Sequence, residues 1–563
     1  MCGRRPGTGP PVDWSPVSQS GRGTASRPTG TGPLTLADLA DLLGAPVQGD
    51  AGTAVTGVTL ASGEVGPGDL YAALPGARTH GARYAADAAA RGAAAVLTDP
   101  AGREEAAATG LPVCVVDDPR GLLGAVAARV YGEPARRLQV IGITGTNGKT
   151  TTSYLVEAGL AAAGRGTGLV GTVETRTRGR AADGTPTVTT LPSVRTTPEA
   201  PALHALLARM ADSGVQTVVM EVSSHALVLG RVGGIPFAAA GFTNLGRDHL
   251  DFHTDIEDYF LAKARLFDGR AAVEVVDVDD PYGQRLTGML GGRRAVTVSS
   301  RGADADWRAT DLAPAPGGGT AFTLTGPDGR SWPARVRLPG GFNVANAVLA
   351  VALLDAVGVP VGTALAGLAE TVVPGRMEPV DAGQPFVAVV DYAHTPDAVA
   401  TALAALRAAT PGRVLTVLGC GGDRDPGKRA AMGEAAARGS DLLVVTDDNP
   451  RSEDPAAIRA AMLAGVPAER RGDVLEIGDR RAAIAAAVAA ARPGDAVLVA
   501  GKGHETGQDV AGTRHPFDDR AVLREALRAA GRGGAPDTTE LARSCEDTAP
   551  PSTGTTSAGE ETP

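Results

Sequence analysis

The sequence predicts an α/β protein with largely parallel sheets. Short runs rich in β-branched residues alternate with stretches rich in alanine and leucine, which is the pattern of strands joined by helices. A length of 563 residues exceeds one hydrophobic core and indicates about three domains. Polar residues cluster directly after several of the apolar runs. We expect strands at residues 94–98, 113–116, 217–222, 387–391, 414–418, 442–446 and 496–500.

Composition changes divide the chain into five segments. Residues 1–32 and 531–563 are rich in Gly, Pro, Ser and Thr without apolar periodicity, and we interpret them as a disordered leader and tail. Between them we expect domains at residues 33–137, 138–373 and 374–530, the last beginning where a helix-rich stretch gives way to Gly375.

Charge and cysteine content narrow the classes of protein. The net charge of −10 implies no broad basic surface and argues against nucleic acid as a partner. The 4 cysteines form no C-x-x-C pair, so neither a zinc site nor a disulfide framework is indicated, and a reducing cytoplasm fits. The N-terminus lacks an apolar signal region, and the apolar run at 482–491 is too short to span a membrane.

A glycine loop at residues 142–152 is the strongest local signal. It follows a predicted strand at 138–143 and precedes a predicted helix at 153–163. Backbone N–H groups, a helix N-terminus, Lys149 and Thr150 together suit the phosphates and Mg²⁺ of a nucleotide. The spacing departs from G-x-x-x-x-G-K-[ST], because Gly142 lies one residue too far from Gly148. A bare Gly-Lys-Thr is often a chance loop, but the flanking strand and helix favour nucleotide binding.

Three further residues of the central domain have two interpretations each. Glu221 ends a strand, where a carboxylate is either a Mg²⁺ ligand or a surface acid. His249 lies between two acids and is either structural or a metal ligand. Lys263 lies in a helical pattern, and taken alone it is a solvated surface lysine.

Polar loops also follow four predicted strands of the third domain. They occupy residues 391–396, 419–425, 447–451 and 501–505. Loops after neighbouring parallel strands meet at one edge of a sheet. Their joint occurrence is better explained by a ligand site than by separate turns.

Together these residues resemble the Mur ligases, the ATP-dependent amide-bond enzymes of peptidoglycan assembly. The loop Gly145–Thr151 looks like the family's ATP loop, with the family's own glycine spacing. Residues 221–225, 244–251, 391–397 and 448–451 are most similar to the branch that adds the third residue of the stem peptide. The resemblance covers about residues 33–530. It implies a UDP-sugar domain, a central P-loop ATPase domain and a C-terminal Rossmann-like domain.

The resemblance also implies ligands and residue roles. ATP, with Mg²⁺, would convert a substrate carboxylate to an acyl phosphate, which an incoming amine then attacks. The implied catalytic and metal-ligating residues are Lys149, Thr150, Glu221, His249 and Lys263, the last carboxylated on its amine by CO₂. ATP would contact Gly145, Thr146, Asn147, Gly148, Lys149, Thr150, Thr151, Asp391 and His394. The UDP-muramyl dipeptide would contact Leu60, Ser62, Ala77, Arg78, Thr79, Thr196, Thr197, Ser223 and Arg231.

Diaminopimelate is the amino acid that the resemblance favours. Its implied contacts are Arg424, Asp448, Asn449, Pro450, Arg451, Gly501 and Glu505. Arg451 offers a bidentate partner for the second carboxylate that lysine lacks, while Glu505 suits an ammonium. The stereoisomer stays open, and nothing demands more than a monomer or suggests a membrane partner.

Several departures keep alternatives open. Ala61-Ser62-Gly63 stands where the family usually has Asp-Ser-Arg, and Asp277 stands where an asparagine is common near the adenine. The alternatives are a paralogue with another amino acid or acceptor, a ligase of the folylpolyglutamate or cyanophycin type, and a non-catalytic scaffold. A P-loop GTPase is a weaker option, because it leaves the third-domain loops without a purpose.

Overall fold

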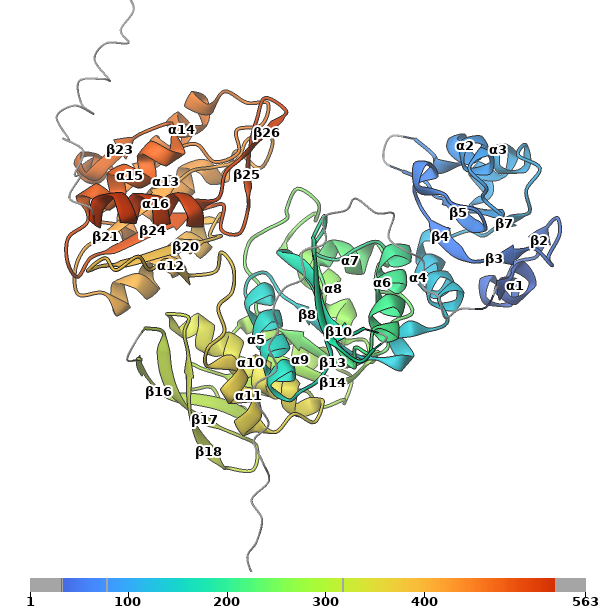
Figure 1. Ribbon diagram of the computed structural model, residues 1–563, viewed down its shortest axis with the longest axis horizontal. Coiled ribbons are helices and arrows are strands. Elements are labelled where there is room, and N and C mark those ends of the chain that lie inside the picture. Colours follow the sequence, from blue (N-terminus) through green and yellow to red (C-terminus); the bar gives the residue numbers. More distant parts are fainter. Residues whose placement is uncertain (1–31, 33, 77–78, 182, 316–317, 532–563) are drawn as a thin grey trace, which may run out of the picture. The chain divides into compact units, whose positions relative to one another are not determined.

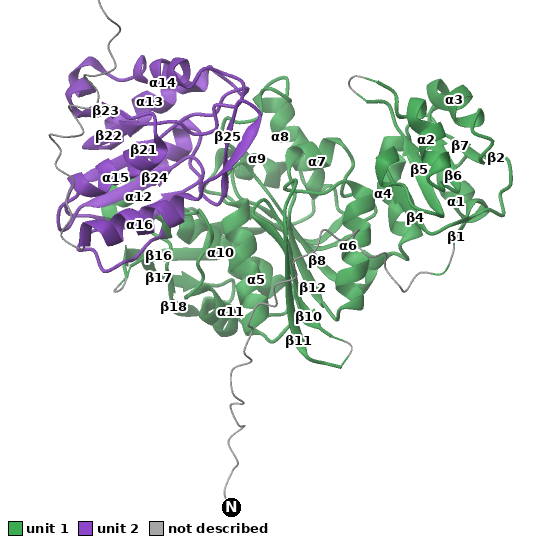
Figure 2. Cartoon of the chain, turned by 45° about the horizontal axis from the view of Figure 1, so that its top comes forward, with its two compact units in different colours: residues 1–378, 404–409 green, residues 379–403, 410–563 purple. Residues whose placement is uncertain are grey.

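The chain forms two compact units in the computed structural model, which describes residues 32, 34–76, 79–181, 183–315 and 318–531. The first unit comprises residues 1–378 with 404–409, and the second comprises 379–403 with 410–563 (Figure 2). Apart from residues 32 and 531, the predicted leader and tail lie outside the described residues.

The first unit begins with a five-stranded sheet in the order β2-β7-β6-β5-β4, in which β4 to β7 are parallel and β2 is antiparallel (Figure 1). Its strands are β2 (Val47–Gln48), β4 (Gly57–Thr59), β5 (Asp69–Ala73), β6 (Ala95–Thr98) and β7 (Val113–Val115), beside a β1 (Leu34–Thr35) and β3 (Ala54–Val55) pair. The helices are α1 (Leu36–Leu43), α2 (Ala85–Ala90), α3 (Arg103–Ala107) and α4 (Pro119–Val130).

The same unit contains an eleven-stranded sheet in the order β11-β10-β9-β12-β8-β13-β14-β15-β16-β17-β18. In this order the seven neighbouring strands β9, β12, β8, β13, β14, β15 and β16 run parallel. Antiparallel strands extend the sheet at one end with β10 and β11 and at the other with β17 and β18. The strands are β8 (Gln139–Thr144), β9 (Thr167–Val170), β10 (Glu174–Arg180), β11 (Pro186–Pro192), β12 (Thr217–Glu221), β13 (Phe237–Phe242), β14 (Ala271–Asp277), β15 (Val296–Ser299), β16 (Trp307–Pro314), β17 (Thr320–Thr325) and β18 (Ser331–Val336).

Helices cover both faces of this sheet, so its parallel strands are buried on both sides. They are α5 (Lys149–Ala162), α6 (Ala200–Asp212), α7 (Ser224–Val228), α8 (Ile256–Ala264), α9 (Pro281–Met289), α10 (Gly341–Ala356) and α11 (Val361–Leu368). Strand β12 shows the alternation, since Val218 and Met220 belong to one apolar cluster and Val219 to the other. Burial on two faces explains why this strand is a continuous apolar run.

The second unit has a six-stranded sheet in the order β19-β20-β24-β21-β22-β23, in which β20 to β24 are parallel. Its strands are β19 (Glu378–Pro379), β20 (Val387–Asp391), β21 (Val414–Leu418), β22 (Leu442–Val445), β23 (Val474–Glu476) and β24 (Ala496–Ala500), with a separate hairpin of β25 (Gly507–Val510) and β26 (Thr513–Pro516). The helices are α12 (Pro396–Ala409), α13 (Lys428–Gly439), α14 (Pro455–Leu463), α15 (Arg480–Ala490) and α16 (Asp519–Gly531).

The α/β prediction with largely parallel sheets is confirmed, and β20, β21 and β24 have the predicted bounds. Helix α5 begins at Lys149, four residues before the predicted start at 153, because Gly148 at φ 89° turns the chain directly into the helix. Short 3₁₀ helices lie at Ser62–Glu64, Gly81–Tyr84, Pro100–Gly102, Pro134–Arg137, Arg265–Phe267 and Ala468–Asp473. Within the described ranges, no helix is both long and apolar enough to cross a membrane.

A buried ion pair joins α15 to α16 in the second unit. Arg480 Nε and Nη2 donate to the two carboxylate oxygens of Asp519 at 2.8 and 2.7 Å, and both side chains are 0% exposed. Arg480 Nη2 also donates to the carbonyl of Ala500 at 2.8 Å. The guanidinium therefore links two helices to the end of β24.

We expect Arg480→Met to lower the free energy of unfolding by about 3–5 kcal/mol, because it leaves the Asp519 carboxylate buried without its partner. The matched control is Arg481→Met, which removes an ion pair with Glu525 whose side chains are 58% and 61% exposed. That loss should stay below about 1 kcal/mol. Urea unfolding measures both, and equal losses would contradict the assigned role of the buried pair.

Candidate active site

The glycine loop between β8 and α5 is closely packed from behind. A side-chain carbon at Gly145 would lie 1.8 Å from Thr243 Oγ1, and one at Gly148 would lie 2.3 Å from Asn346 Oδ1. Both glycines have positive φ, 143° and 89°. Glycine is therefore required at both positions by conformation and by space. Thr150 and Thr151 lie buried in the first turn of α5.

A second loop, after β13, holds the glycine loop in place. Asn244 Oδ1 accepts from the backbone N–H of Asn147 at 3.0 Å, and its Nδ2 donates to the Asn147 carbonyl at 3.1 Å. Thr146 Oγ1 donates to the Tyr259 hydroxyl at 3.2 Å and accepts from the Gly246 N–H at 3.0 Å. The loop is thus fixed in advance of any ligand, which is what a phosphate-binding loop requires.

Two lysines donate to one carbonyl oxygen of this loop. Lys149 Nζ lies 2.9 Å and Lys263 Nζ lies 2.8 Å from the oxygen of Gly145. Burial lowers the pKa of Lys149, against the opposing effect of Glu221 and Asp248. Two amines therefore lie together at the loop, and bound nucleotide phosphates would favour their charged forms.

Lys263 is buried, so the interpretation as a surface lysine was wrong. It is 1% exposed and lies 4.3 Å from the centre of the Tyr259 ring. Burial and then the neighbouring Lys149 charge hold its pKa well below the usual lysine range. A buried amine with a depressed pKa is neutral more often and therefore more nucleophilic. Tyr259, Phe260 and Ala262 of the same helix are also buried, whereas Leu261 is exposed.

Glu221 is also buried and lies beside the first turn of α5. Both of its carboxylate oxygens are 3.0 Å from Thr150 Oγ1. Thr172 donates to the same carboxylate through its N–H at 2.8 Å and its hydroxyl at 3.0 Å. Since Glu221 is 1% exposed, the alternative of a surface acid is wrong.

His249 adopts a left-handed backbone conformation, with φ 54°, after Arg247-Asp248. Its Nε2 lies 3.5 Å from Asp248 Oδ2, and its ring meets that of His225 at 5.0 Å. Burial lowers its pKa to about 4, and the nearby lysine charges act in the same direction. The imidazole is therefore neutral near pH 7, which is the form that binds metals.

These groups fit Mg²⁺ through their chemistry. In the part of the chain that the structure describes, no cluster of three His, Cys, Asp or Glu side chains forms a complete metal cage. A hydroxyl and a carboxylate in contact, Thr150 and Glu221, suit a magnesium ion that takes its other ligands from phosphate and water. His249 near Lys263 would suit a second ion only if that lysine became an anion.

Residues predicted for the muramyl peptide gather near Glu221. Thr196 Oγ1 lies 3.0 Å from Thr172 Oγ1, and Arg231 Nη1 donates to the Thr197 carbonyl at 3.2 Å. The Thr197 hydroxyl donates to the Glu221 carbonyl at 2.8 Å and accepts from the Ser223 N–H at 3.1 Å. Thr197 is 0% exposed, so its hydroxyl supports the site from behind.

The residues predicted for uridine lie at the carboxyl edge of the first sheet. Leu60 and Ser62 follow β4, and Thr79 follows the neighbouring parallel strand β5. Thr79 Oγ1 accepts from Arg83 Nη1 at 3.4 Å. Ala77 and Arg78 were also predicted here and lie outside the described residues.

In the second unit the polar loops do meet at one sheet edge, because β20, β24, β21 and β22 are adjacent and parallel. The Gly501 N–H donates to the Asp391 carbonyl at 3.1 Å, and Asp391 Oδ1 accepts from the Ala393 N–H at 2.8 Å. His394 Nδ1 lies 2.8 Å from the Tyr392 carbonyl. The predicted ATP residues Asp391 and His394 thus stand next to the predicted amino-acid loops.

The loops after β21 and β22 are tied to each other. The Gly422 N–H donates to the Asn449 carbonyl at 2.9 Å, and the Ser452 hydroxyl donates to Asp423 Oδ1 at 2.6 Å. Pro450 is buried between them, and Arg424 is exposed. These contacts bring the predicted diaminopimelate residues into one surface.

Arg451 is held against the neighbouring loop, and its backbone is constrained. Its φ is 52°, its N–H donates to the Asp509 carbonyl at 2.9 Å, and its carbonyl accepts from the Ala511 N–H at 2.6 Å. Arg451 Nη1 donates to the Gly422 carbonyl at 2.5 Å. Asp509 of β25 and the adjoining Ala511 therefore fix the backbone of Arg451, and the Gly422 carbonyl holds its guanidinium.

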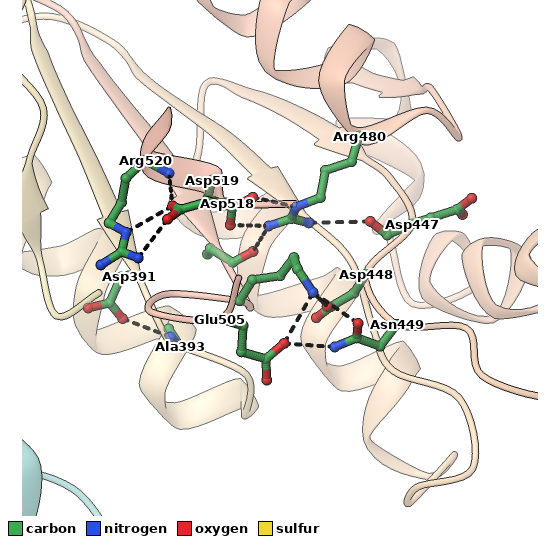
Figure 3. A network of polar contacts seen from close by, with 12 residues as sticks. Asp391, Ala393, Asp447, Asp448, Asn449, Arg480, Glu505, Asp518, Asp519 and Arg520 are labelled. Atoms are coloured by element: carbon green, nitrogen blue, oxygen red, sulfur yellow. Dashed lines mark hydrogen bonds and ion pairs between the residues drawn. The ribbon is translucent and has the colours of Figure 1, made fainter. Parts of the chain in front are cut away.

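Asp448, Asn449 and Glu505 form a polar cluster (Figure 3), and Gly501 lies against it. Asn449 Nδ2 donates to Glu505 Oε2 at 2.8 Å, and a side-chain carbon at Gly501 would lie 2.9 Å from Asp448 Oδ2. Four of the seven residues predicted for the amino acid thus meet in one place. Lys502, at the centre of the cluster, was not predicted.

Three further residues were missed in the first unit. They are Thr172, which contacts Glu221, Arg376, whose Nη2 lies 3.4 Å from Thr150 Oγ1, and Asn346, which backs Gly148. The only sequence signal was for Asn346, since Asn343 and Asn346 interrupt one face of an otherwise apolar helix. The other two are brought to the site by the fold.

Comparison with known proteins agrees with this geometry. Residues 54–131 match the Mur ligase family catalytic domain, 143–354 the Mur ligase middle domain, and 375–503 the Mur ligase glutamate ligase domain. A UDP-N-acetylmuramoyl-L-alanyl-D-glutamate–2,6-diaminopimelate ligase of Streptomyces avermitilis is 55% identical over 508 residues, covering 89% of this chain and 98% of that protein. The chain belongs to the Mur ligase family.

Other members of the family extend the comparison. A Corynebacterium glutamicum protein with the same name is 49% identical over 510 residues, covering 88% of this chain and 96% of its own. A UDP-N-acetylmuramyl-tripeptide synthetase of Leifsonia xyli is 47% identical over 518 residues, which cover 90% of this chain and 98% of that protein. A solved structure of a diaminopimelate ligase has a TM-score of 0.64 at 32% identity and covers 89% of this Mur ligase and 99% of its own chain.

Asp277, which departs from the common asparagine, is buried at the end of β14. Its Oδ1 accepts from the Asp279 N–H at 2.9 Å. Burial raises its pKa from 3.8 to about 7, and the charges of Asp279 and Asp280 add to the rise. A raised pKa means that the folded protein loses stability as the pH rises from about 4 to above 7.

We therefore expect Asp277→Asn to raise the free energy of unfolding by about 1–3 kcal/mol at pH 8 and to leave it unchanged near pH 4. The amide keeps the acceptor for the Asp279 N–H and carries no charge. Urea unfolding at both pH values tests this, with the exposed Asp304→Asn as the control. A gain that does not depend on pH would rule out the buried charge as its cause.

Proposed function

We propose that this Mur ligase adds diaminopimelate to the D-glutamate of UDP-N-acetylmuramoyl-L-alanyl-D-glutamate, with release of ADP and phosphate, in peptidoglycan biosynthesis. The observation that carries the proposal is the convergence of Lys149, Lys263 and the Thr150–Glu221 pair on the glycine loop. The relatives of 49–55% identity are named for this reaction and match over nearly their whole length.

The glycine loop would bind the phosphates of ATP. Its backbone N–H groups and the N-terminus of α5 provide positive potential. Lys149, which donates to the Gly145 carbonyl of the same loop, would donate to a phosphate oxygen instead when ATP binds. Because the substrate carboxylate and the phosphate are both anions, most of the catalytic work is to neutralise and align them.

Thr150 and Glu221 would hold Mg²⁺, and the 3.0 Å contact between their hydroxyl and carboxylate supports this assignment. When bound, Mg²⁺ neutralises phosphate charge and polarises the transferring phosphoryl group. Thr172 keeps the Glu221 carboxylate oriented through two hydrogen bonds. Arg376, close to Thr150, adds positive charge on the same side.

Lys263 would act as a carbamate. Its neutral amine would attack the carbon of CO₂, and the nitrogen would pass one proton to solvent, so a neutral amine would become a carbamate anion. The anion would attract the Lys149 ammonium, which shares the Gly145 carbonyl, and would supply an oxygen ligand for a second Mg²⁺ beside His249. The depressed pKa of Lys263 supports the first step.

The second unit would bind the amino acid. Arg451, whose backbone is held by β25, would pair with the distal carboxylate of diaminopimelate. Arg424 is exposed in the loop that follows β21. Asp448, Asn449 and Glu505 would receive the ammonium group. Lysine lacks the distal carboxylate, so it would leave Arg451 without a partner.

The muramyl dipeptide would lie along Thr196, Ser223 and Arg231, with its uridine end at Leu60, Ser62 and Thr79. Ala61 and Gly63 leave two fewer polar groups at that end than the family usually has. This departure is the one observation that favours the second candidate, a paralogue that uses another acceptor.

The test is phosphate release by the purified protein with ATP, Mg²⁺ and the UDP-muramyl dipeptide, with meso-diaminopimelate, LL-diaminopimelate, lysine or ornithine added in turn. We expect release with one diaminopimelate isomer at least about 100-fold faster than with lysine, because a missing charged partner costs several kcal/mol. Release with lysine alone would overturn the amino-acid assignment. No release with any of them would favour another acceptor.

For Lys263, we expect Lys263→Ala to lower kcat by about 100-fold or more, with partial recovery in added acetate, because a ligand of the second ion is lost. Lys263→Arg is the control: it keeps a cation but cannot form a carbamate, and it should be equally impaired without recovery. Carbon-13 NMR in labelled bicarbonate should show a carbamate signal in the wild type and in neither variant. Normal turnover by Lys263→Ala would refute the role.

A further inference from the structure

Lys502 is a buried cation that no residue pattern assigned to the pocket. It follows β24, and its side chain is 0% exposed. Its Nζ lies 2.9 Å from Asn449 Oδ1, 3.1 Å from Glu505 Oε2 and 3.3 Å from Asp448 Oδ1. An ammonium has three N–H donors, and all three have partners here. Lys502 is therefore saturated within the protein and has no donor left for a substrate.

These contacts fix which way the Asn449 amide faces. Its Oδ1 accepts from Lys502 Nζ and from the Asp509 N–H at 3.0 Å, so the oxygen faces inward. Its Nδ2 donates to Glu505 Oε2 at 2.8 Å. Rotation of the amide by 180° would place its NH₂ against the ammonium of Lys502, so the orientation has no alternative.

The Glu505 carboxylate is oriented by the same cation. Oε2 accepts from both Lys502 Nζ and Asn449 Nδ2, and the side chain is 31% exposed. The hydrogen bonds of this carboxylate in the described part of the chain all end on Oε2, which leaves Oε1 as the oxygen available to a ligand. Figure 3 shows Glu505 and Asn449 facing each other at the loop ends.

Charge in the cluster follows from the same three side chains. Asp448 and Glu505 contribute two negative charges and Lys502 one positive charge, so the cluster carries one net negative charge. This net negative charge suits an ammonium ligand.

We propose that Lys502 is the positioning residue of the amino-acid pocket: it holds the Asn449 amide and the Glu505 carboxylate in the arrangement that receives the ammonium of the incoming amino acid. This inference rests on the proposed function only in requiring that an amino acid binds at these loops. Arg480 supports the arrangement, since it binds the Ala500 carbonyl at 2.8 Å and the Asp447 carbonyl at 3.4 Å on the two strand ends that carry the cluster (Figure 3).

The test is a double-mutant cycle of Lys502→Met and Glu505→Gln, with KM measured for ATP, for the muramyl dipeptide and for the amino acid that the wild type incorporates. Lys502→Met should raise the KM for the amino acid about tenfold or more and change the other two less than twofold. In the Glu505→Gln background, Lys502→Met should raise the KM for the amino acid by less than a further twofold, because the carboxylate that Lys502 positions is already gone.

The matched control is Arg413→Met. It removes an ion pair with Asp495 at the opposite end of β24, with the Nη2 to Oδ2 distance at 2.7 Å, and should lower stability without changing the KM for the amino acid. If Lys502→Met does not fold, Lys502→Gln, which keeps a donor, serves in its place. Independent, multiplicative effects of the two substitutions, or equal rises in all three KM values, would overturn the positioning role.

The Lys502 role can be tested even if the protein does not incorporate diaminopimelate. If the wild type incorporates lysine or another amino acid, the cycle is measured with that amino acid and still decides the role of Lys502. If the wild type incorporates none, binding of diaminopimelate by calorimetry to the wild type and to Lys502→Met replaces KM. A wild-type affinity that the substitution leaves unchanged would overturn the inference.

Discussion

The active site of this Mur ligase depends on the carbonyl oxygen of Gly145, to which two lysine side chains donate. Two like charges at one acceptor repel, and in a buried setting that repulsion is large. The protein without ligands is therefore short of negative charge at this place. Anionic phosphates would supply it, and so would the carbamate proposed for Lys263. The glycine loop, Glu221 and the helix that carries Lys263 are arranged around these two amines.

In the second unit, a buried lysine lies in a cluster whose net charge is negative. Its neighbours there are two carboxylates and an amide. Each unit thus leaves an unbalanced charge at the carboxyl ends of its parallel strands, and each places a fully or nearly fully buried lysine beside it. A ligase that joins an anion to an amine needs these two environments of opposite sign, with ordered groups in both.

The sequence predicted those strands and site residues whose structure is determined by neighbouring residues in the chain. Strands β20, β21 and β24 had correct bounds because they are short apolar runs between helices. Strands β10, β11 and β16 to β18 were missed because they are half exposed, and Thr and Arg dominate β10. The loops of the second unit were predicted as one site because neighbouring parallel strands bring their ends together. Lys263 was taken for a surface residue without the family resemblance because its acceptor, Gly145, lies 118 residues away.

The two edges of the eleven-stranded sheet have a consequence for the solubility of the protein. An open sheet of this size exposes unpaired N–H and C=O groups on its outer strands, which invites pairing with another molecule. Strand β11 begins and ends with proline, at Pro186 and Pro192, and the opposite outer strand, β18, has Pro333 in its interior. Proline lacks the N–H that such pairing needs. The hairpins that widen the sheet thus also end it, and they protect the molecule against edge-to-edge aggregation.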